Sequence, residues 1–221
     1  MPPLDLIASL LNENHGNKLE EVSFSPNLDI SQNLNRPDTL LVLTEGIAKV
    51  EVSRKNSWEF ETLIAVGAVF GIEHCFSNRK YEDTTNYRAI ALTDGQAFEI
   101  QKYFFLQYMY THPALFHFII EELIVRYKFL TFNYQEKKSP LKQRVIDLLM
   151  EFIILTRQDL KQQYVTLPLF DENMVANPLK CSTHHIENIF KRLSKQKLIL
   201  KSDETGIVLD CERLKKLSTF S

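Results

Sequence analysis

The chain has 221 residues, of which 44% are apolar and 24% are charged, and its formal net charge is −2. This length fits two modest domains better than one, and the composition is ordinary for a globular protein with a core of useful size. The three cysteines form no CxxC pair and no zinc pattern, and no apolar stretch reaches the ~18 residues of a membrane span. We therefore expect free thiols, a reducing compartment, a cytoplasmic location and no membrane partner.

Charge is divided unevenly along the chain. Residues 1–135 contain 11 Lys and Arg against 17 Asp and Glu, whereas residues 136–221 contain 15 against 11. The front half is therefore acidic and the back half basic. This asymmetry indicates that the back half is the part that meets a polyanion, although a net charge of this size is also ordinary for a domain.

The first elements are a short helix and a strand pair. Residues 4–11 have the apolar spacing of a short amphipathic helix. After a polar stretch over 17–37, residues 39–54 contain two apolar runs on either side of Glu45–Gly46. This pattern predicts two strands joined as a hairpin.

Further short strands follow before residue 101. Residues 58–65 predict one strand, and residues 87–100 predict two more around the turn Asp94–Gly95, which is a strong hairpin signal. Short strands with turn signals at this spacing are typical of a small β-barrel or roll. We therefore predict an α+β protein whose first domain, residues 1–101, is a jelly-roll-like β-roll that binds an effector.

Residues 102–136 predict one long helix with two apolar faces. One face has steps of four and three residues, which is the heptad spacing of a seam between helices: Phe116, Ile120, Leu123, Tyr127, Leu130 and Tyr134. The second apolar face contains Phe118, Ile119, Ile124, Val125 and Phe129. A helix with two apolar faces has two partners to cover them, so we predict a homodimer along the seam. The alternative is that the seam packs on the chain's own roll.

A polar break at Glu136–Pro140 predicts a hinge, after which Ser139 is a candidate N-cap and Pro140 suits the first position of the next helix. This break opens the predicted third part, residues 137–221. We expect the hinge to let the front domain shift the helix pair between two states.

The stretch 164–209 has the order strand, short helix, helix, hairpin. The short helix at 171–180 is predicted to be distorted, because Pro178 lies inside it. Ser182 is a good N-cap for the second helix, which has an apolar stripe formed by Ile186, Ile189, Phe190 and Leu193. Two short strands around Asp203–Gly206 complete the pattern of a winged helix-turn-helix domain.

The polar face of that second helix suits DNA. A helix fits the major groove, and side chains near its N-terminus reach base edges, as Thr183, His184 and Asn188 would here. The helix start and its cations would hold phosphates, which completes the predicted DNA-binding set: Ser182, Lys191, Arg192 and Lys195. The alternative is a winged helix that contacts a protein, or a helix that only caps its domain.

These segments together resemble the Crp/Fnr family of bacterial transcriptional regulators over most of the chain. The segment LLVLTEGIAKVEV is similar to the family's strand–Glu-Gly–strand signature, and VGAVFGIEHCF resembles its Gly-rich segment before the phosphate-binding cassette. The segment CSTHHIENIFKRLSKQKLI is similar to the family's recognition-helix signature. The resemblance implies an effector-binding β-roll, a dimer helix and a DNA-binding winged helix.

The chain departs from the cyclic-AMP-binding members of that family. Asp83-Thr84 stands near the family's phosphate-holding Arg-Ser pair, and an aspartate there would repel a phosphate. We therefore expect no cyclic AMP binding. The alternative is that Arg88 takes the place of the missing phosphate-holding arginine. The candidate effector pocket consists of Gly71, Glu73, Asp83, Thr84 and Arg88. In the recognition helix, Thr183-His184 replaces the family's Arg-Glu pair and Asn188 replaces a later arginine, so the target site should differ.

Other chemistry is not predicted. No cysteine precedes Cys75, so the iron–sulfur cluster of the oxygen-sensing members is not expected. Cys75 lies near the predicted effector pocket and is either an inert buried thiol or a redox sensor. The histidine pairs His184–His185 and His112/His117 have poor spacing for a metal site. No nucleophile–base pair, phosphate loop or catalytic carboxylate pair occurs, so we expect neither an enzyme nor a cofactor.

The sequence thus predicts a sequence-specific, homodimeric DNA-binding regulator of a palindromic-type site, modulated by a signal at the β-roll. Its predicted partners are double-stranded DNA, a second copy of itself, RNA polymerase and an unidentified small-molecule effector. The alternative is a small-molecule-sensing module whose winged helix docks a protein partner.

Overall fold

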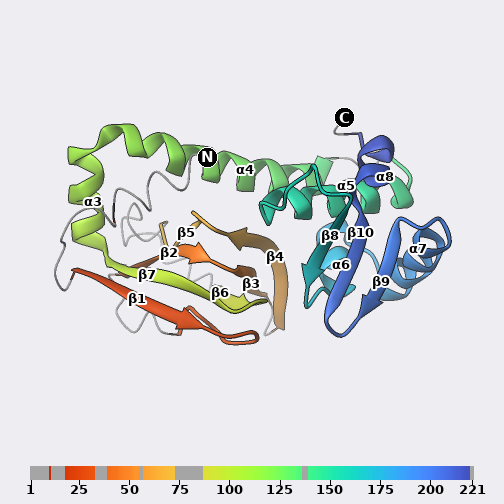
Figure 1. Cartoon of the computed structure of the whole chain (residues 1–221), viewed down its shortest axis with the longest axis horizontal. Coiled ribbons are helices and arrows are strands. Elements are labelled where there is room, and N and C mark those ends of the chain that lie inside the picture. The colour runs from red at the N-terminus through yellow and green to blue at the C-terminus, as the bar shows by residue number, and fades with distance from the viewer. Residues whose placement is uncertain are drawn as a thin grey trace.

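The structure, a computed structural model, describes residues 10, 18–32, 39–54, 57–72, 87–135 and 139–219. It consists of a β-roll, helices that run along the roll, and a winged-helix domain at the other end (Figure 1). This arrangement confirms the predicted α+β class. The helix predicted at 4–11 lies outside the described residues, apart from Leu10.

Two antiparallel sheets form the roll. One has the strand order β1-β7-β2-β5 and the other has the order β4-β3-β6. The strands are β1 (Leu19–Phe24), β2 (Thr39–Glu45), β3 (Ile47–Arg54), β4 (Ser57–Ala65), β5 (Val69–Phe70), β6 (Tyr87–Ala91) and β7 (Gly95–Gln101). Strand β1 had not been predicted, because its segment LEEVSF has little apolar alternation. It forms the edge of its sheet and pairs with β7 from Leu19 opposite Ile100 to Phe24 opposite Gly95.

The hairpins predicted at Glu45–Gly46 and Asp94–Gly95 are wrong, although the strands themselves are present. Strands β2 and β3 flank Gly46 but lie in different sheets, and so do β6 and β7, which flank Asp94–Gly95. Both turns are corners at which the chain passes from one sheet to the other. A Cβ atom on Gly46, whose φ is +89°, would lie 2.9 Å from the carbonyl oxygen of Asp94. The corners therefore need glycine because they pack on each other.

The roll has a filled interior and a covered outer face. Between the sheets lies a hydrophobic cluster that includes Leu43, Ala48, Val50, Ile64, Phe70, Ala89 and Ala91. On the outer face of the three-stranded sheet, Phe60 and Leu63 belong instead to the core of the winged-helix domain. The two ends of the molecule therefore share one core.

The long helix predicted over 102–136 is divided. The structure has α3 (Lys102–Thr111), a 3₁₀ turn η2 (Pro113–Leu115) and α4 (Phe116–Gln135). Proline lacks an N–H and disfavours the helical conformation in the preceding residue, and His112 accordingly has φ −124° and ψ 66°.

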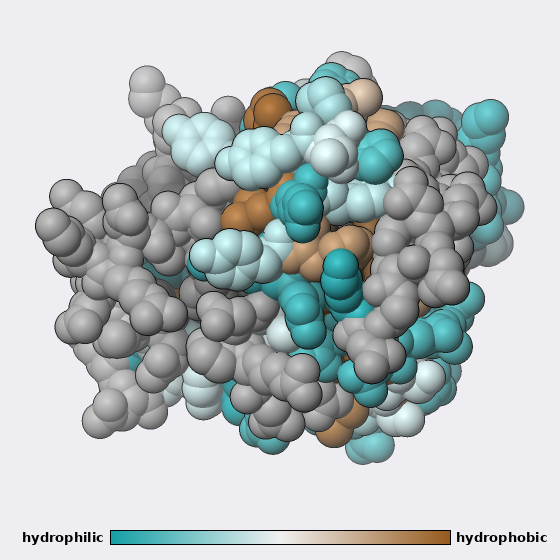
Figure 2. Space-filling view, turned by 90° about the vertical axis from the view of Figure 1, so that its left-hand side faces the viewer, coloured by the Kyte–Doolittle hydropathy of each residue, from teal (hydrophilic) through white to brown (hydrophobic). Residues whose placement is uncertain are grey.

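At the end of the molecule that contains α3, apolar and aromatic side chains reach the surface among polar ones (Figure 2). Among the helices of the described ranges, none is both long and apolar enough to cross a membrane.

Helix α5 (Leu141–Leu155) opens the third part of the chain. Pro140 occupies its N-cap position with no side-chain cap, so the predicted cap at Ser139 and the first helical position for Pro140 are each off by one residue. Proline still fits there, because the start of a helix does not need its missing N–H. Residues 136–138 of the predicted hinge lie outside the described residues.

The winged-helix domain has a three-stranded sheet of order β8-β10-β9 and four helices, counting α5. Its further elements are β8 (Tyr164–Pro168), α6 (Asn173–Leu179), α7 (Thr183–Lys195), β9 (Ile199–Asp203), β10 (Gly206–Asp210) and α8 (Cys211–Leu217). The predicted order of strand, short Pro178-containing helix, helix and hairpin is confirmed, and α8 is an addition. We refer to the β9–β10 hairpin as the wing.

Four aromatic rings connect the roll to α7. Phe60 of β4 packs edge-on against Phe152 of α5, with ring centroids 5.6 Å apart. Phe152 contacts Phe170 at 5.8 Å, and Phe170 stacks on Phe190 of α7 at 6.1 Å. The orientation of α7 therefore depends on side chains that extend back to the β-roll.

Candidate nucleic-acid interface

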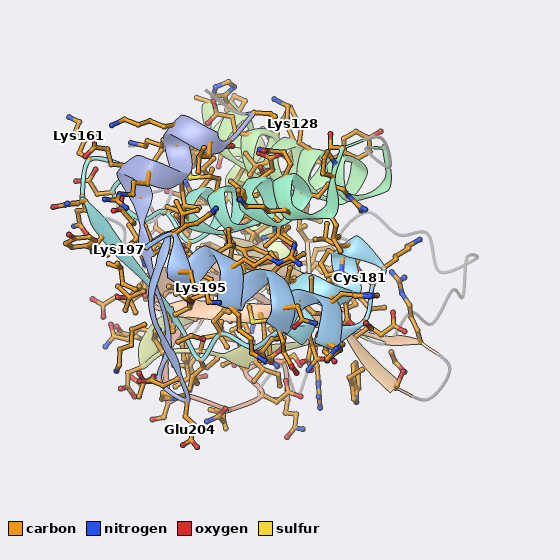
Figure 3. The ribbon with its side chains drawn as sticks, turned by 90° about the vertical axis from the view of Figure 1, so that its right-hand side faces the viewer. Lys128, Lys161, Cys181, Lys195, Lys197 and Glu204 are labelled. Atoms are coloured by element: carbon orange, nitrogen blue, oxygen red, sulfur yellow. The ribbon has the colours of Figure 1, made fainter. Side chains whose placement is uncertain are left out.

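Helix α7 is fixed from beneath by its apolar stripe. Ile186 and Leu193 have no exposed surface, and Ile189 and Phe190 are buried beside them. At its beginning the hydroxyl of Ser182 accepts a hydrogen bond from the backbone N–H of His185 at 3.4 Å, which confirms the predicted cap. Figure 3 looks at this face of the domain, with Cys181 at the beginning of α7 and Lys195 near its end.

The outer face of α7 presents the predicted base-reading residues together. Thr183 and His184 are exposed and Asn188 is half-buried, and His184 and Asn188, four residues apart, lie on the side opposite the stripe. The side-chain amide nitrogen of Asn188 lies 3.2 Å from Nε2 of His184, and Nδ1 of His184 lies 3.9 Å from a carboxylate oxygen of Glu187. The side chains of Asn188, His184 and Glu187 thus form a connected polar row.

The predicted phosphate-binding cations follow along the same helix. Lys191, Arg192 and Lys195 are all exposed, and Arg192 and Lys195 lie in the last turn, where cations also stabilise the C-terminal end of a helix. The N–H groups of the capped first turn are the other group that can bind a phosphate.

The structure adds three cations that the sequence had not indicated. Lys142 donates a hydrogen bond to the side chain of Gln196 at 2.8 Å, and Arg213 donates to the Gln196 backbone carbonyl at 3.3 Å. With Lys216 they line a groove of about 360 Å³ beside the end of α7. They come from α5 and α8, so only the tertiary fold brings them to α7.

The wing has a negative tip. Glu204 lies at its end, next to Asp203 (Figure 3). Hydrogen bonds from Lys201 and from Thr205 lower the pKa of Asp203 to about 2, so this carboxylate stays ionised at neutral pH. The carboxylates of Asp203 and Glu204 are therefore not phosphate-binding groups, and the charge of Asp203 is matched by Lys201, whose Nζ lies 2.6 Å away.

The outer side of α4 carries an exposed apolar row. Ile120, Leu123, Ile124 and Tyr127 are 51%, 42%, 46% and 67% exposed. Three of them belong to the predicted seam, while Ile124 had been assigned to the second face. Phe116, a predicted seam residue, instead packs partly against the roll core, as Phe118 and Ile119 do. The side chains of Leu130, Tyr134 and Phe129 lie outside the described residues.

The candidate effector pocket is only partly described. Glu73, Asp83 and Thr84 lie outside the described residues, and Gly71 is buried after β5 with φ +87°. Arg88 projects from the outer face of its sheet, opposite Ala89 and Ala91 of the interior cluster. Its guanidinium lies 2.7 Å from the Glu51 carboxylate and 4.3 Å from the centre of the Trp58 ring. The structure does not direct Arg88 into the roll interior.

That arginine belongs to a charge cluster of its own. Burial by itself would raise the pKa of Glu51, but hydrogen bonds from Lys49 and Arg88 outweigh it and hold the pKa below its ordinary value. Arg88 is therefore already matched by an ionised partner.

The two cysteines among the described residues have thiols that are poor nucleophiles. Burial raises the pKa of Cys181 and of Cys211, which disfavours the nucleophilic thiolate. Cys75 lies outside the described residues, so its assignment as an inert buried thiol, with a redox sensor as the alternative, stays a prediction. Within the described ranges, no group of three or more His, Cys, Asp and Glu side chains could hold a metal ion.

Comparisons with known proteins identify the fold. No protein-family model matches the chain, and no curated relative matches it. A cyclic nucleotide-binding domain containing protein from Listeria monocytogenes EGD-e is 15% identical, with a TM-score of 0.69, over 96% of this chain and 99% of that one. The c-di-GMP responsive global regulator CLP from Xanthomonas campestris is 14% identical, with a TM-score of 0.66, over 93% and 99%.

A third structure names the family directly. The transcriptional regulator TTHA1359 of the CRP/FNR family, from Thermus thermophilus, is 19% identical, with a TM-score of 0.62, over 90% of this chain and 98% of that one. The likeness in all three cases covers the β-roll, the connecting helices and the winged helix in the same order. The chain therefore has the fold of the Crp/Fnr regulators, as its motifs had indicated.

Proposed function

We propose that this chain is a sequence-specific DNA-binding transcription regulator. The observation that carries the proposal is the outer face of α7, where an N-capped, firmly anchored helix presents polar side chains first and cations after them. A helix of this kind fits the major groove of B-DNA. Thr183, His184 and Asn188 read base edges, while the helix start at Ser182 and the cations Lys191, Arg192 and Lys195 hold phosphates.

The regulator acts as a homodimer on a palindromic-type site. The exposed row of Ile120, Leu123, Ile124 and Tyr127 is an apolar surface on one side of α4. A second copy related by a two-fold axis would cover it with the same residues. Two α7 helices would then enter successive major grooves, with half-sites about one helical turn apart.

A signal at the β-roll modulates this activity. The shared core and the ring contacts from Phe60 to Phe190 support this modulation, because a displacement of β4 would shift the side chains that pack beneath α7. The effector is an unidentified small molecule other than cyclic AMP, and RNA polymerase is a further partner.

The second candidate function is a small-molecule-sensing module whose winged helix docks a protein partner. The carboxylates at the wing tip, Asp203 and Glu204, favour it.

The test is selection of bound duplexes from a random DNA pool by the purified chain at two salt concentrations. We expect an enriched inverted repeat with half-sites about one turn apart. The affinity for the enriched duplex should fall with salt, with a slope of about −0.9 for each phosphate contact, because DNA releases counterions. No enrichment at either salt, with and without cell extract as an effector source, would reject the DNA-binding proposal in favour of protein docking.

A matched pair of variants locates the interface. Lys191→Gln should reduce the salt slope by about two units, because it removes one phosphate contact from each of the two copies in the dimer. Lys161 is also exposed but lies away from α7 (Figure 3), so Lys161→Gln should leave the slope unchanged. Equal effects of both variants would mean that α7 is not the DNA-binding element.

A further inference from the structure

A groove of about 360 Å³ lies beside the C-terminal end of α7. It is lined by residues of α5, of α8 and of the turn that joins α7 to β9: Lys142, Gln196, Leu198, Arg213, Lys216 and Leu217. This volume is at the lower end of the range for binding pockets in proteins. The groove has room for one or two side chains of a partner, so its surface chemistry indicates what kind of partner fits.

The floor of the groove is apolar. Leu198 is buried, whereas Leu217, in the last turn of α8, is 48% exposed. Leu214, one turn earlier in the same helix, has no exposed surface. Exposed apolar surface with a polar rim around it is the arrangement found at the centre of protein interfaces. Leu217 is therefore the side chain that an apolar group of a partner would cover.

The cations on the rim are held in place before any partner binds. Lys142 donates a hydrogen bond to the side-chain oxygen of Gln196 at 2.8 Å, and Arg213 donates to the backbone carbonyl of the same residue at 3.3 Å. Gln196 therefore orders one cation of α5 and one cation of α8 at once. A side chain that is already ordered loses less conformational freedom on binding, which favours affinity.

The positive charge of the rim is only partly cancelled within the described ranges. Arg213 lies 3.3 Å from the carboxylate of Asp210, and Lys216 lies 2.7 Å from the carboxylate of Glu212. Lys142 is instead bonded to a neutral amide, so its charge is not cancelled by that contact. A carboxylate that approaches the groove would therefore meet a positive rim.

An apolar floor inside a cationic rim fits a protein segment better than a phosphate backbone. Phosphates would satisfy the cations but would leave Leu217 without an apolar partner. An acidic segment with one large apolar side chain satisfies both parts of the groove. The apolar side chain covers Leu217, and the neighbouring carboxylates pair with Lys142 and Lys216.

The groove is also separated from the base-reading end of α7. The helix has 13 residues, so its two ends lie about 20 Å apart. Thr183 and His184 stand at the first end, while Gln196 is the C-cap at the second. A partner in the groove therefore leaves the first turn of α7 open to DNA.

We propose that this groove is a docking site for a protein partner, which inserts one apolar side chain flanked by carboxylates. The inference goes beyond the proposed DNA-binding function and does not depend on it. It assigns to the winged-helix domain a second surface, formed by α5, α8 and the end of α7, for an acidic partner.

The test is selection of bound peptides from a displayed library of random peptides by the purified full chain. We expect the enriched peptides to share one large apolar residue with two or more Asp or Glu within about four positions of it. The affinity of an enriched peptide, measured by fluorescence anisotropy, should fall as salt screens the ion pairs at the rim. Enriched peptides that lack acidic residues, or no enrichment, would overturn the inference.

Two pairs of variants locate the bound peptide. Leu217→Ser should weaken it roughly four- to tenfold, because about half of a leucine loses its apolar partner. Leu200 on β9 is 45% exposed, so Leu200→Ser is the matched control and should leave affinity unchanged. Lys142→Gln should weaken the peptide about two- to fivefold, as expected for an exposed ion pair, and Lys161→Gln should not. Unchanged affinity in both groove variants, or equal losses in their controls, would place the peptide elsewhere and refute the proposal.

Duplex binding separates this inference from the proposed function. The peptide and a selected duplex should bind together without competition. If the duplex displaces the peptide and Lys142→Gln lowers the salt slope of duplex binding, the groove binds phosphates and the inference is wrong. Self-association that Leu217→Ser abolishes would assign the groove to a second copy, which also overturns it. Failure to select any duplex, with peptide binding intact, rejects the proposed function alone.

Discussion

Replacement of Leu123 by lysine tests the dimer surface on α4. Leu123 is 42% exposed, so a partner would cover a little less than half of its side chain. Complete burial of a leucine contributes about 1.5–3 kcal/mol, so this part is worth about 1 kcal/mol in each copy. Each lysine weakens dimerisation by at least about 1 kcal/mol more, because its ammonium group is drawn toward an apolar interface even when its chain bends outward.

These contributions occur twice in a symmetric dimer and sum to about 4 kcal/mol, which weakens the dimer roughly a thousandfold. Sedimentation equilibrium over a range of protein concentrations measures the loss, and duplex binding should weaken with it. Leu28 on the roll is also 42% exposed, so Leu28→Lys is a matched control that should remain dimeric. If Leu123→Lys associates as tightly as the control while its thermal unfolding is unchanged, the row on α4 is not the dimer interface.

Three other changes test the shared core, a buried carboxyl group and the wing. Phe152→Ala should lower the free energy of unfolding in urea by about 3–5 kcal/mol, because the ring is fully buried, whereas Ile154→Ala, 39% exposed on the same helix, should cost far less; equal losses would contradict the shared core. Burial raises the pKa of Glu151 above 4.5, so its contribution to stability is full below pH 4.5 and is lost as pH rises through the higher folded value. Glu151→Gln should therefore gain stability relative to the wild type at pH 8 compared with pH 5, and a difference that does not vary with pH would refute this. Glu204→Gln should raise duplex affinity a few-fold at low salt if the wing tip approaches phosphates, and an unchanged affinity would place the tip away from the DNA.

The winged-helix half of the fold could be predicted because its signals are local. An N-cap at Ser182, a stripe at helical spacing and a turn closed by Gly206 each specify structure within a few residues. Gly206 illustrates the point, since its φ is +136° and a Cβ there would lie 2.2 Å from a backbone oxygen. The same local logic placed His184 and Asn188, four residues apart, on one face of the helix.

The β-roll could be predicted only in part. Turn residues at Gly46 and Asp94–Gly95 mark where strands end, but they do not specify whether the next strand pairs with the previous one or crosses to another sheet. The long-range packing of the two corners on each other made that choice, and it is visible only in three dimensions.

The sequence by itself determined the order of the winged-helix elements from β8 to β10, the capped, amphipathic character of α7 and the residue types on its surface. Spacing and capping are properties of neighbours in the chain, so they can be read without the fold. The tertiary structure alone decided which strands pair, that Arg88 is held by Glu51, and that Lys142 and Arg213 join the end of α7. It also revealed the contact between His184 and Asn188 and the ring contacts from Phe60 to Phe190, because these depend on distances and side-chain directions.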